Sequence, residues 1–158
     1  MEGTRQVTIK LNILPIENSP GYIIHYLDLL LKFGLHKAFQ AQGINITAEQ
    51  WAILASLWEE DGIHQSSIAE KIGKDRHTIT RMLNLLEKNG FVRRVPTDED
   101  KRRLNVYLTD RGRSMQEKLV PIALDFGEKA FAGLTQKELT ELTRILRHIT
   151  ANLASLKS

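Results

Sequence analysis

The chain has 158 residues, of which 42% are hydrophobic and 26% charged, which suits one or two small globular domains. It contains no cysteine, which excludes disulfides, thiolate metal sites and thiol-based redox sensing. No run approaches the roughly 18 apolar residues of a membrane span, and the first residues lack the apolar core of a signal peptide. We therefore expect a cytoplasmic protein without a membrane-embedded part.

The positive charge is concentrated in the middle of the chain. Residues 62–113 contain 12 Lys or Arg and 7 Asp or Glu, whereas the remainder contains 10 and 12. The middle segment is therefore +5 and the rest −2, within a net charge of +3. A polyanion would be drawn to this segment. Basic residues that only solvate a surface are the alternative, so the residue pattern must decide.

Residues 1–18 are predicted to form an N-terminal arm. Apolar and polar residues alternate from Val7 to Ile13, as in a strand, and Pro15 would end any regular element. A short strand or extended arm packed on a partner is one interpretation, and disorder is the other.

A long helix is predicted from Pro20 to about Gln42, with Ser19 as its N-cap. Its apolar residues surround most of the helix, which requires burial on more than one side. One small domain cannot easily supply that burial, but a partner subunit could. A second helix should begin with the capping box at Thr47 and run to about Glu60.

The basic segment is predicted to contain a helix–turn–helix and a β-hairpin. Two short helices are expected over 65–72 and 76–89, with Asp75 as the N-cap of the second. Strands near 92–95 and 104–108 would enclose a charged loop. This order is that of a winged helix, which places one helix in a DNA major groove and a cationic loop beside it.

Two further helices are predicted towards the C-terminus. Thr109 should cap the first, which would run to about Ala132 with a kink or local unwinding at Pro121. The second begins with a capping box at Thr135. Its apolar residues then recur at spacings of three and four, as in a coiled coil: Leu139, Leu142, Leu146, Ile149, Leu153 and Leu156. Packing on the chain's own core is the alternative, but together with the apolar first helix this seam favours a dimer.

These elements predict a mainly α fold. It combines a winged helix-turn-helix, which has a small β-hairpin wing, with an all-helical dimerisation lobe built from both chain ends. The expected boundaries are 1–18 for the arm, 19–46 and 110–158 for the lobe, and 47–109 for the winged helix-turn-helix DNA-binding domain.

The second helix of the basic segment has an apolar and a polar face. The apolar face carries Ile79, Met82, Leu83 and Leu86. On the polar face, Arg81 can donate twice to guanine and Asn84 can pair with adenine through both amide atoms. The first turns of both helices add groups that suit phosphates or base edges. The predicted DNA contacts on the two helices are Gln65, Ser66, Ser67, Arg76, His77, Thr78, Thr80, Arg81, Asn84 and Lys88. An ordinary solvated helix face is the alternative.

The tip of the hairpin is predicted to act as a DNA-binding wing. Asp100 could hold the loop by accepting from the Arg102 side chain or from backbone N–H groups. Arg102 would then enter a narrow minor groove, while Lys101 and Arg103 would meet phosphates. A local surface salt bridge, worth about 0–1 kcal/mol, is the alternative.

The order and spacing of four segments resemble the MarR (multiple antibiotic resistance regulator) family of winged-helix repressors. The segments are Ile68–Gly73, Thr78–Leu83, Leu86–Val92 and Asp100–Gly112. The resemblance implies a homodimer that binds a pseudo-palindromic operator, with Arg102 in the minor groove. It also implies that small molecules, often anionic or aromatic, weaken DNA binding. His64 departs from the Ser or Thr cap that relatives often have, and the lack of cysteine departs from the peroxide-sensing branch.

Candidates for an effector pocket are His25 and Trp51, although a tryptophan on a capped helix is more often part of a core and a histidine on a helix face is more often solvated. No phosphate-binding glycine loop, zinc-binding His pair or nucleophile elbow occurs, so we expect no enzyme, no cofactor and no metal site. The expected function is sequence-specific binding of double-stranded DNA by a ligand-responsive, homodimeric transcriptional repressor. The competing hypothesis is a winged-helix protein-interaction module that binds an acidic partner.

Overall fold

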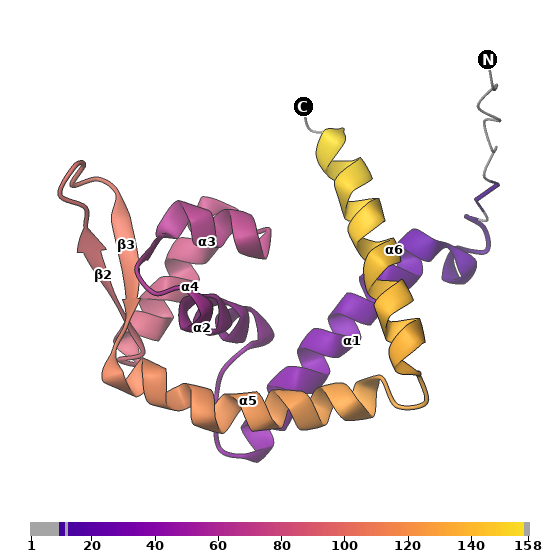
Figure 1. Cartoon of the computed structure of the whole chain (residues 1–158), viewed down its shortest axis with the longest axis horizontal. Helices are drawn as coiled ribbons and strands as arrows, with labels where there is room; N and C mark the ends of the chain where they lie inside the picture. Colours follow the sequence, from indigo (N-terminus) through magenta and orange to yellow (C-terminus); the bar gives the residue numbers. More distant parts are fainter. Residues whose placement is uncertain (1–9, 12, 157–158) are drawn as a thin grey trace. The chain divides into compact units, whose positions relative to one another are not determined.

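The computed structural model describes residues 10–11 and 13–156, and the chain is mainly helical, as predicted (Figure 1). In chain order the elements are the 3-10 helix η1 (Ile16–Asn18), α1 (Pro20–Ala41), α2 (Ala48–Glu59), β1 (Ile63–His64), α3 (Gln65–Ile72), α4 (Arg76–Lys88), β2 (Val92–Pro96), β3 (Leu104–Leu108), α5 (Asp110–Ala130) and α6 (Gln136–Ser155). The predicted helices and strands are present, and their ends lie within two residues of the expected positions.

The chain divides into two compact units within α5, the first ending at Leu124 and the second beginning at Asp125. The first unit contains α1, the winged helix-turn-helix and most of α5. The second contains the end of α5 and all of α6. The assignment of 19–46 and 110–158 to one dimerisation lobe stays a prediction, because such a lobe would be completed by a partner chain.

The sheet of the winged helix is antiparallel, with the strand order β1-β3-β2. β2 and β3 form the predicted hairpin, paired from Val92 opposite Leu108 to Pro96 opposite Leu104. β1 pairs with the other edge of β3, Ile63 opposite Val106. The sequence does not indicate β1, because two residues are too short to show an alternating pattern.

The core of the first unit is formed by one face of each of α2, α3 and α4 together with the sheet, and Phe39 of α1 and Met115 and Leu119 of α5 complete it. α4 contributes Ile79, Leu83 and Leu86, all fully buried, and Met82 is partly buried beside them. These four residues are the predicted apolar face. Since α4 buries this side against the core, its opposite side is turned to solvent.

The helix caps position the elements locally, and most of them follow the sequence. Capping boxes form at Thr47 and Thr135, and Asp75 caps α4. Thr109 caps α5 by accepting from the backbone N–H of Gly112 at 3.0 Å, and its hydroxyl donates to the carbonyl of Gly90.

Two local expectations need correction. Ser19 is at the N-cap position of α1, but its side chain accepts no capping hydrogen bond. The first helical residue is Pro20, as expected, and the Ser19 carbonyl accepts from the N–H of Ile23. A capping hydroxyl would accept from the N–H of Gly21 or Tyr22, and nothing in the described residues explains why Ser19 does not. Local unwinding at Pro121, one of the two outcomes expected there, does not occur, because α5 stays helical through this residue. The missing N–H of proline removes only one hydrogen bond from a helix of 21 residues.

The predicted arm falls largely on residues outside the described part of the chain. Of the strand-like stretch, residues 7–9 and 12 are not described, and Lys10, Leu11 and Ile13 belong to no strand. The first regular element is η1, which directly follows Pro15.

The terminal helices keep large apolar surfaces exposed in the single chain. On α1 the exposed side chains are Tyr22, Ile23, Ile24, Tyr26, Leu27, Leu29, Leu30 and Phe33. No residue of α6 is buried, and its seam is exposed from Leu146 onward. Whether the α6 seam forms a dimer or packs on the chain's own core stays open, and the dimer stays the prediction. None of the helices in the described residues is both long and apolar enough to cross a bilayer.

Candidate nucleic-acid interface

The N-terminus of α4 is held by Asp75. Its carboxylate accepts from the Thr78 hydroxyl at 2.6 Å and from the Thr78 backbone N–H at 2.9 Å. These bonds, the hydroxyl first, hold the pKa of Asp75 below its ordinary value. The outward face of α4 follows from this anchoring and from the buried side, and its exposed polar residues are Arg76, His77, Arg81, Asn84 and Lys88, with Leu85 exposed beside them.

Two of the predicted contact residues also connect the helices of the helix–turn–helix. The Gln65 side chain donates from Nε2 to Thr80 Oγ1 at 2.7 Å, and the Thr80 hydroxyl donates to the carbonyl of Arg76 at 2.8 Å. Gln65, Thr78 and Thr80 are half-buried. The bond between Gln65 and Thr80 therefore helps to orient α3 against α4, whereas Thr78 is held by Asp75 within the α4 cap. Any contact of these residues with DNA would be in addition to these roles.

The first turn of α3 presents small polar groups to solvent. Ser66 and Ser67 are exposed, and His64, at the N-cap position, makes no side-chain capping bond. The backbone N–H groups of this turn consequently lack a side-chain cap, which leaves them suited to a phosphate oxygen.

Asp100 holds the loop of the wing by accepting hydrogen bonds from backbone N–H groups. This is one of the two arrangements expected from the sequence, the other being a bond from the Arg102 side chain. Asp100 Oδ1 accepts from the N–H of Arg102 at 2.9 Å, and the carbonyl of Asp100 accepts from the N–H of Arg103 at 2.9 Å. The Thr97 hydroxyl donates to the same carbonyl at 2.8 Å. The side chains of Lys101, Arg102 and Arg103 are exposed, and no ion pair among the described residues involves them.

The wing and α4 are joined by Arg94, which the sequence did not single out. Arg94 lies on β2, and its Nη2 donates to Asn84 Oδ1 at 2.6 Å and to Glu87 Oε2 at 2.6 Å. The bond from the Arg94 side chain holds the pKa of Glu87 below its ordinary value. Asn84 was expected to pair with adenine through both amide atoms, but its oxygen is already engaged by Arg94. No sequence signal marks this contact, because a turn separates Glu87 from Arg94.

The hairpin of β2 and β3 lies beside α4 (Figure 1), and both α4 and the tip of the hairpin carry exposed basic side chains. We call this set the basic face; it consists of Arg76, His77, Arg81, Lys88, Lys101, Arg102 and Arg103. Its arginines and lysines take part in no ion pair within the described residues. Unneutralised cations next to an exposed helix are the charge pattern that phosphates attract.

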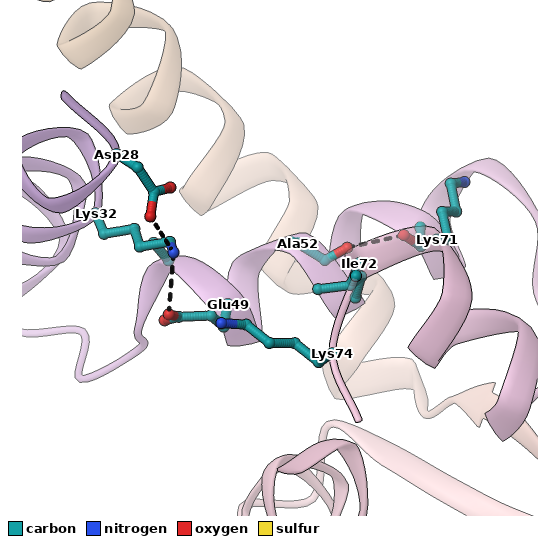
Figure 2. Close-up of a pocket in the computed structure, with 10 residues that line it drawn as sticks. Asp28, Lys32, Glu49, Ala52, Lys71, Ile72 and Lys74 are labelled. Atoms are coloured by element: carbon teal, nitrogen blue, oxygen red, sulfur yellow. Dashed lines mark hydrogen bonds and ion pairs between the residues drawn. The ribbon is translucent and has the colours of Figure 1, made fainter. Parts of the chain in front are cut away.

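An open pocket of about 540 Å³ lies between α1, α2 and the C-terminal end of α3. Figure 2 shows Lys32 in this pocket between two acidic groups, 2.6 Å from Asp28 and 3.8 Å from Glu49. Lys71 and Lys74 also line it, and Lys74 has no ion pair among the described residues. The pocket therefore offers both signs of charge to a small polar ligand.

The two residues predicted for an effector pocket do not line this one. His25 is exposed on α1, one turn before Asp28. Trp51 is half-buried, and its ring lies tilted against Phe39 and edge-to-face against Trp58, with centroids 5.7 and 5.4 Å away. Contact of either residue with an effector stays a prediction. Within the described residues, no cluster of three His, Asp or Glu side chains could hold a metal ion.

Comparison with known proteins identifies the fold and the class of protein. The family model described as the MarR family matches residues 46–104. The chain is 31% identical over 140 residues to the HTH-type transcriptional regulator TtmR of Methylorubrum extorquens, over 83% of this chain and 67% of that protein. It is 28% identical over 122 residues to the transcriptional repressor MprA of Escherichia coli, over 77% of this chain and 69% of MprA. A solved structure of a mutant MarR from E. coli complexed with operator DNA matches with a TM-score of 0.74 and 27% identity, over 82% of this chain and 91% of that one.

Proposed function

Because this chain belongs to the MarR family of transcriptional regulators, we propose that it binds operator DNA as a homodimer and represses transcription until a small molecule releases it. The observation that carries the proposal is the unneutralised basic face on α4 and the wing. The similarity to the repressor MprA and to a MarR complexed with operator DNA supports it. The three proteins compared above are described as transcriptional regulators or by the MarR name, and none as a protein-interaction module.

In the proposed complex, α4 lies in the major groove and the wing beside it. His77 and Arg81 reach base edges from the exposed side of α4, and Arg102 enters the adjacent minor groove. Gln65, Ser66 and Ser67 meet phosphates at the start of α3, and Lys101 and Arg103 do so from the wing. Arg76, Thr78, Thr80 and Lys88 complete the proposed contacts along α4.

The exposed apolar side chains of α1 and α6 supply the proposed dimer interface. Such surfaces are unusually large for a chain that stays alone in water. In a two-fold dimer the two copies of α4 would have to lie one DNA turn apart, about 34–36 Å, to occupy successive major grooves. This requirement gives the operator its pseudo-palindromic form. The regulator must share a compartment with its operator, so the cytoplasmic location expected from the sequence is part of the proposal.

The pocket between α1, α2 and α3 is the proposed place for the effector. It joins α1, on the proposed dimer side, to α2 and α3 of the winged helix-turn-helix. A ligand that binds better to one arrangement of these helices would shift the population towards it and change the spacing of the two α4 helices. Lys74 favours an anionic compound there, in line with the effector class expected from the sequence.

The decisive experiment selects bound duplexes from a random pool and measures affinity for the selected sequence by fluorescence anisotropy at several salt concentrations. Arg81→Ala and Arg102→Ala should each weaken binding by about 5- to 150-fold. Arg144→Ala is the matched control, because it removes the same charge from α6, where Arg144 is exposed and paired with Glu141. This control should change affinity less than about twofold.

Selection of a sequence with dyad symmetry, bound with a steep salt dependence, would support the proposal. If no sequence is enriched, or if duplex DNA fails to compete with an acidic protein partner for the basic face, the interaction-module hypothesis replaces it. Release of the selected duplex by members of a panel of anionic and aromatic metabolites tests the effector part separately.

A further inference from the structure

Arg94 fixes the wing against the exposed face of α4. Its side chain is only 15% exposed. Besides the two bonds from Nη2, its Nε donates to Glu87 Oε2 at 3.2 Å and its backbone N–H donates to Glu87 Oε1 at 3.0 Å. A guanidinium held by several charge-assisted bonds has little freedom to move. The position of Arg94 relative to α4 is therefore well defined.

This contact decides which end of the Asn84 carboxamide faces the wing. A guanidinium can only donate hydrogen bonds, and a carboxamide has one accepting atom, so Oδ1 must face Arg94. Asn84 is exposed and lies on the same side of α4 as His77 and Arg81. The amide nitrogen is consequently the group that Asn84 can offer to a molecule outside the chain, and it can only donate.

On the basis of the operator-binding role proposed above, we infer that Arg94 is a positioning residue that makes Asn84 a hydrogen-bond donor, so that Asn84 donates to an acceptor on a base edge instead of pairing with adenine through both amide atoms. Pairing of asparagine with adenine uses both amide atoms, the oxygen accepting from N6 and the nitrogen donating to N7. With Oδ1 engaged, that pairing must compete with a charge-assisted bond. Adenine N7 alone can still accept, but adenine places the N6 donor beside it. Guanine offers two adjacent acceptors, N7 and O6, and thymine offers O4, so an amide that can only donate favours these two bases over adenine.

Glu87 keeps Arg94 from acting as a phosphate contact itself. Its carboxylate neutralises the guanidinium at 2.6 Å, so the Arg94 charge is already compensated inside the protein. The neighbouring Arg93 differs, since it is exposed and lies over the ring of Tyr107, 4.8 Å from the centroid. Arg93→Met is thus a matched control for Arg94→Met, because both remove one charge from β2 and only Arg94 contacts Asn84.

The test compares the base preferences of the wild type and its variants at each operator position. If Arg94 had only a structural role, its loss would not change the preference at one position alone. Each position of the selected operator is substituted with all four base pairs, and relative affinities are measured for the full-length protein. Asn84→Ala should abolish the preference at one position, where the wild type prefers guanine or thymine on the contacted strand. Arg94→Met should lower that preference relative to adenine by about tenfold, while the other positions keep their preferences. Arg93→Met should leave the whole pattern unchanged.

Several outcomes would overturn the inference. The first is a preference for adenine at the position read by Asn84. The second is a uniform loss of affinity in Asn84→Ala, which indicates a phosphate contact. The third is an unchanged base preference in Arg94→Met. In Arg94→Met the carboxylate of Glu87 loses its partner, which could prevent folding. The double variant Arg94→Met, Glu87→Gln removes that carboxylate and therefore repeats the test if the single variant folds poorly. If the wild type selects no sequence, the proposed function fails first. If it selects one and only the Asn84 pattern is absent, the inference alone fails.

Discussion

A methyl group at Gly112 would lie 2.0 Å from the carbonyl oxygen of Phe91. The start of α5 therefore rests directly on the backbone that leads into β2. Two hydrogen bonds fix this approach: the N–H of Thr109 donates to the same Phe91 carbonyl at 3.0 Å, and Trp58 Nε1 donates to the Gly112 carbonyl at 3.0 Å. Any side chain at residue 112 would push α5 away from the base of the wing.

Gly112→Ala is accordingly expected to lower the free energy of unfolding by about 3 kcal/mol, since backbone atoms cannot move aside as a flexible side chain would. Gly127→Ala is the matched control in the same helix, because nothing lies within 4 Å of a Cβ built there. That change should raise stability by up to about 1 kcal/mol through helix propensity. Urea denaturation monitored by circular dichroism measures both, and equal effects of the two variants would contradict this account.

The apolar surface of α1 should be required for dimer formation. Leu30→Glu places a charge on this surface, at a side chain 50% exposed in the single chain, and should weaken the dimer about a hundredfold or more because the charge would be buried without a partner. Leu85→Glu is the control, since Leu85 of α4 is similarly exposed at 47% but lies outside the terminal helices. Sedimentation velocity at several concentrations gives the oligomeric state. A dimer that survives Leu30→Glu unchanged would exclude this part of α1 from the interface.

Asp100 should contribute to DNA binding through the shape of the wing and not through its charge. Asp100→Ala removes the bond to the Arg102 N–H, so we expect DNA affinity to fall about tenfold while the free energy of unfolding changes by less than about 1 kcal/mol. The neighbouring Glu99 is exposed and has no ion pair among the described residues. Glu99→Ala should raise affinity slightly, since it also removes a negative charge near DNA. Opposite signs for the two variants, measured by anisotropy, separate loop geometry from charge.

The contact between Glu87 and Arg94 should depend on pH. Hydrogen bonding from Arg94 lowers the pKa of Glu87 in the folded chain, so the contact adds stability that is fully present above the ordinary carboxyl pKa. That contribution should disappear as the pH falls from the ordinary value of 4.5 through the lowered folded value. Because the Glu87 side chain is 38% exposed, solvent screening limits it to about 1 kcal/mol.

Comparison of the wild type with Glu87→Gln isolates this contribution from those of other carboxyl groups. The two unfolding free energies should differ at neutral pH and converge under acid conditions. Glu99→Gln, in which an exposed wing carboxyl is replaced, is the control, and at neutral pH it should change the free energy of unfolding by less than about 0.5 kcal/mol. A difference for Glu87→Gln that persists below the folded pKa would show that the contact does not depend on ionisation of Glu87.

The sequence predicted the local elements well because local rules govern them. The spacing of Ile79, Leu83 and Leu86 fixes the buried side of α4, and the capping boxes at Thr47 and Thr135 mark where helices begin. Among the predicted caps, only that at Ser19 does not form, and nothing in the described residues explains why. The two-residue strand β1 was missed because its residues become a strand only by pairing with β3.

The linear chain by itself thus determined the order of the helices and of the two hairpin strands, the inward and outward faces of α4, and the family to which the protein is similar. These depend on residue spacings of three, four or two, which are present before folding. Only the tertiary structure decided that Arg94 engages the oxygen of Asn84 and that α5 rests on Phe91 through Gly112. Such contacts depend on the distance between segments brought together by packing, and that distance is set by the whole core and not by any neighbouring residues.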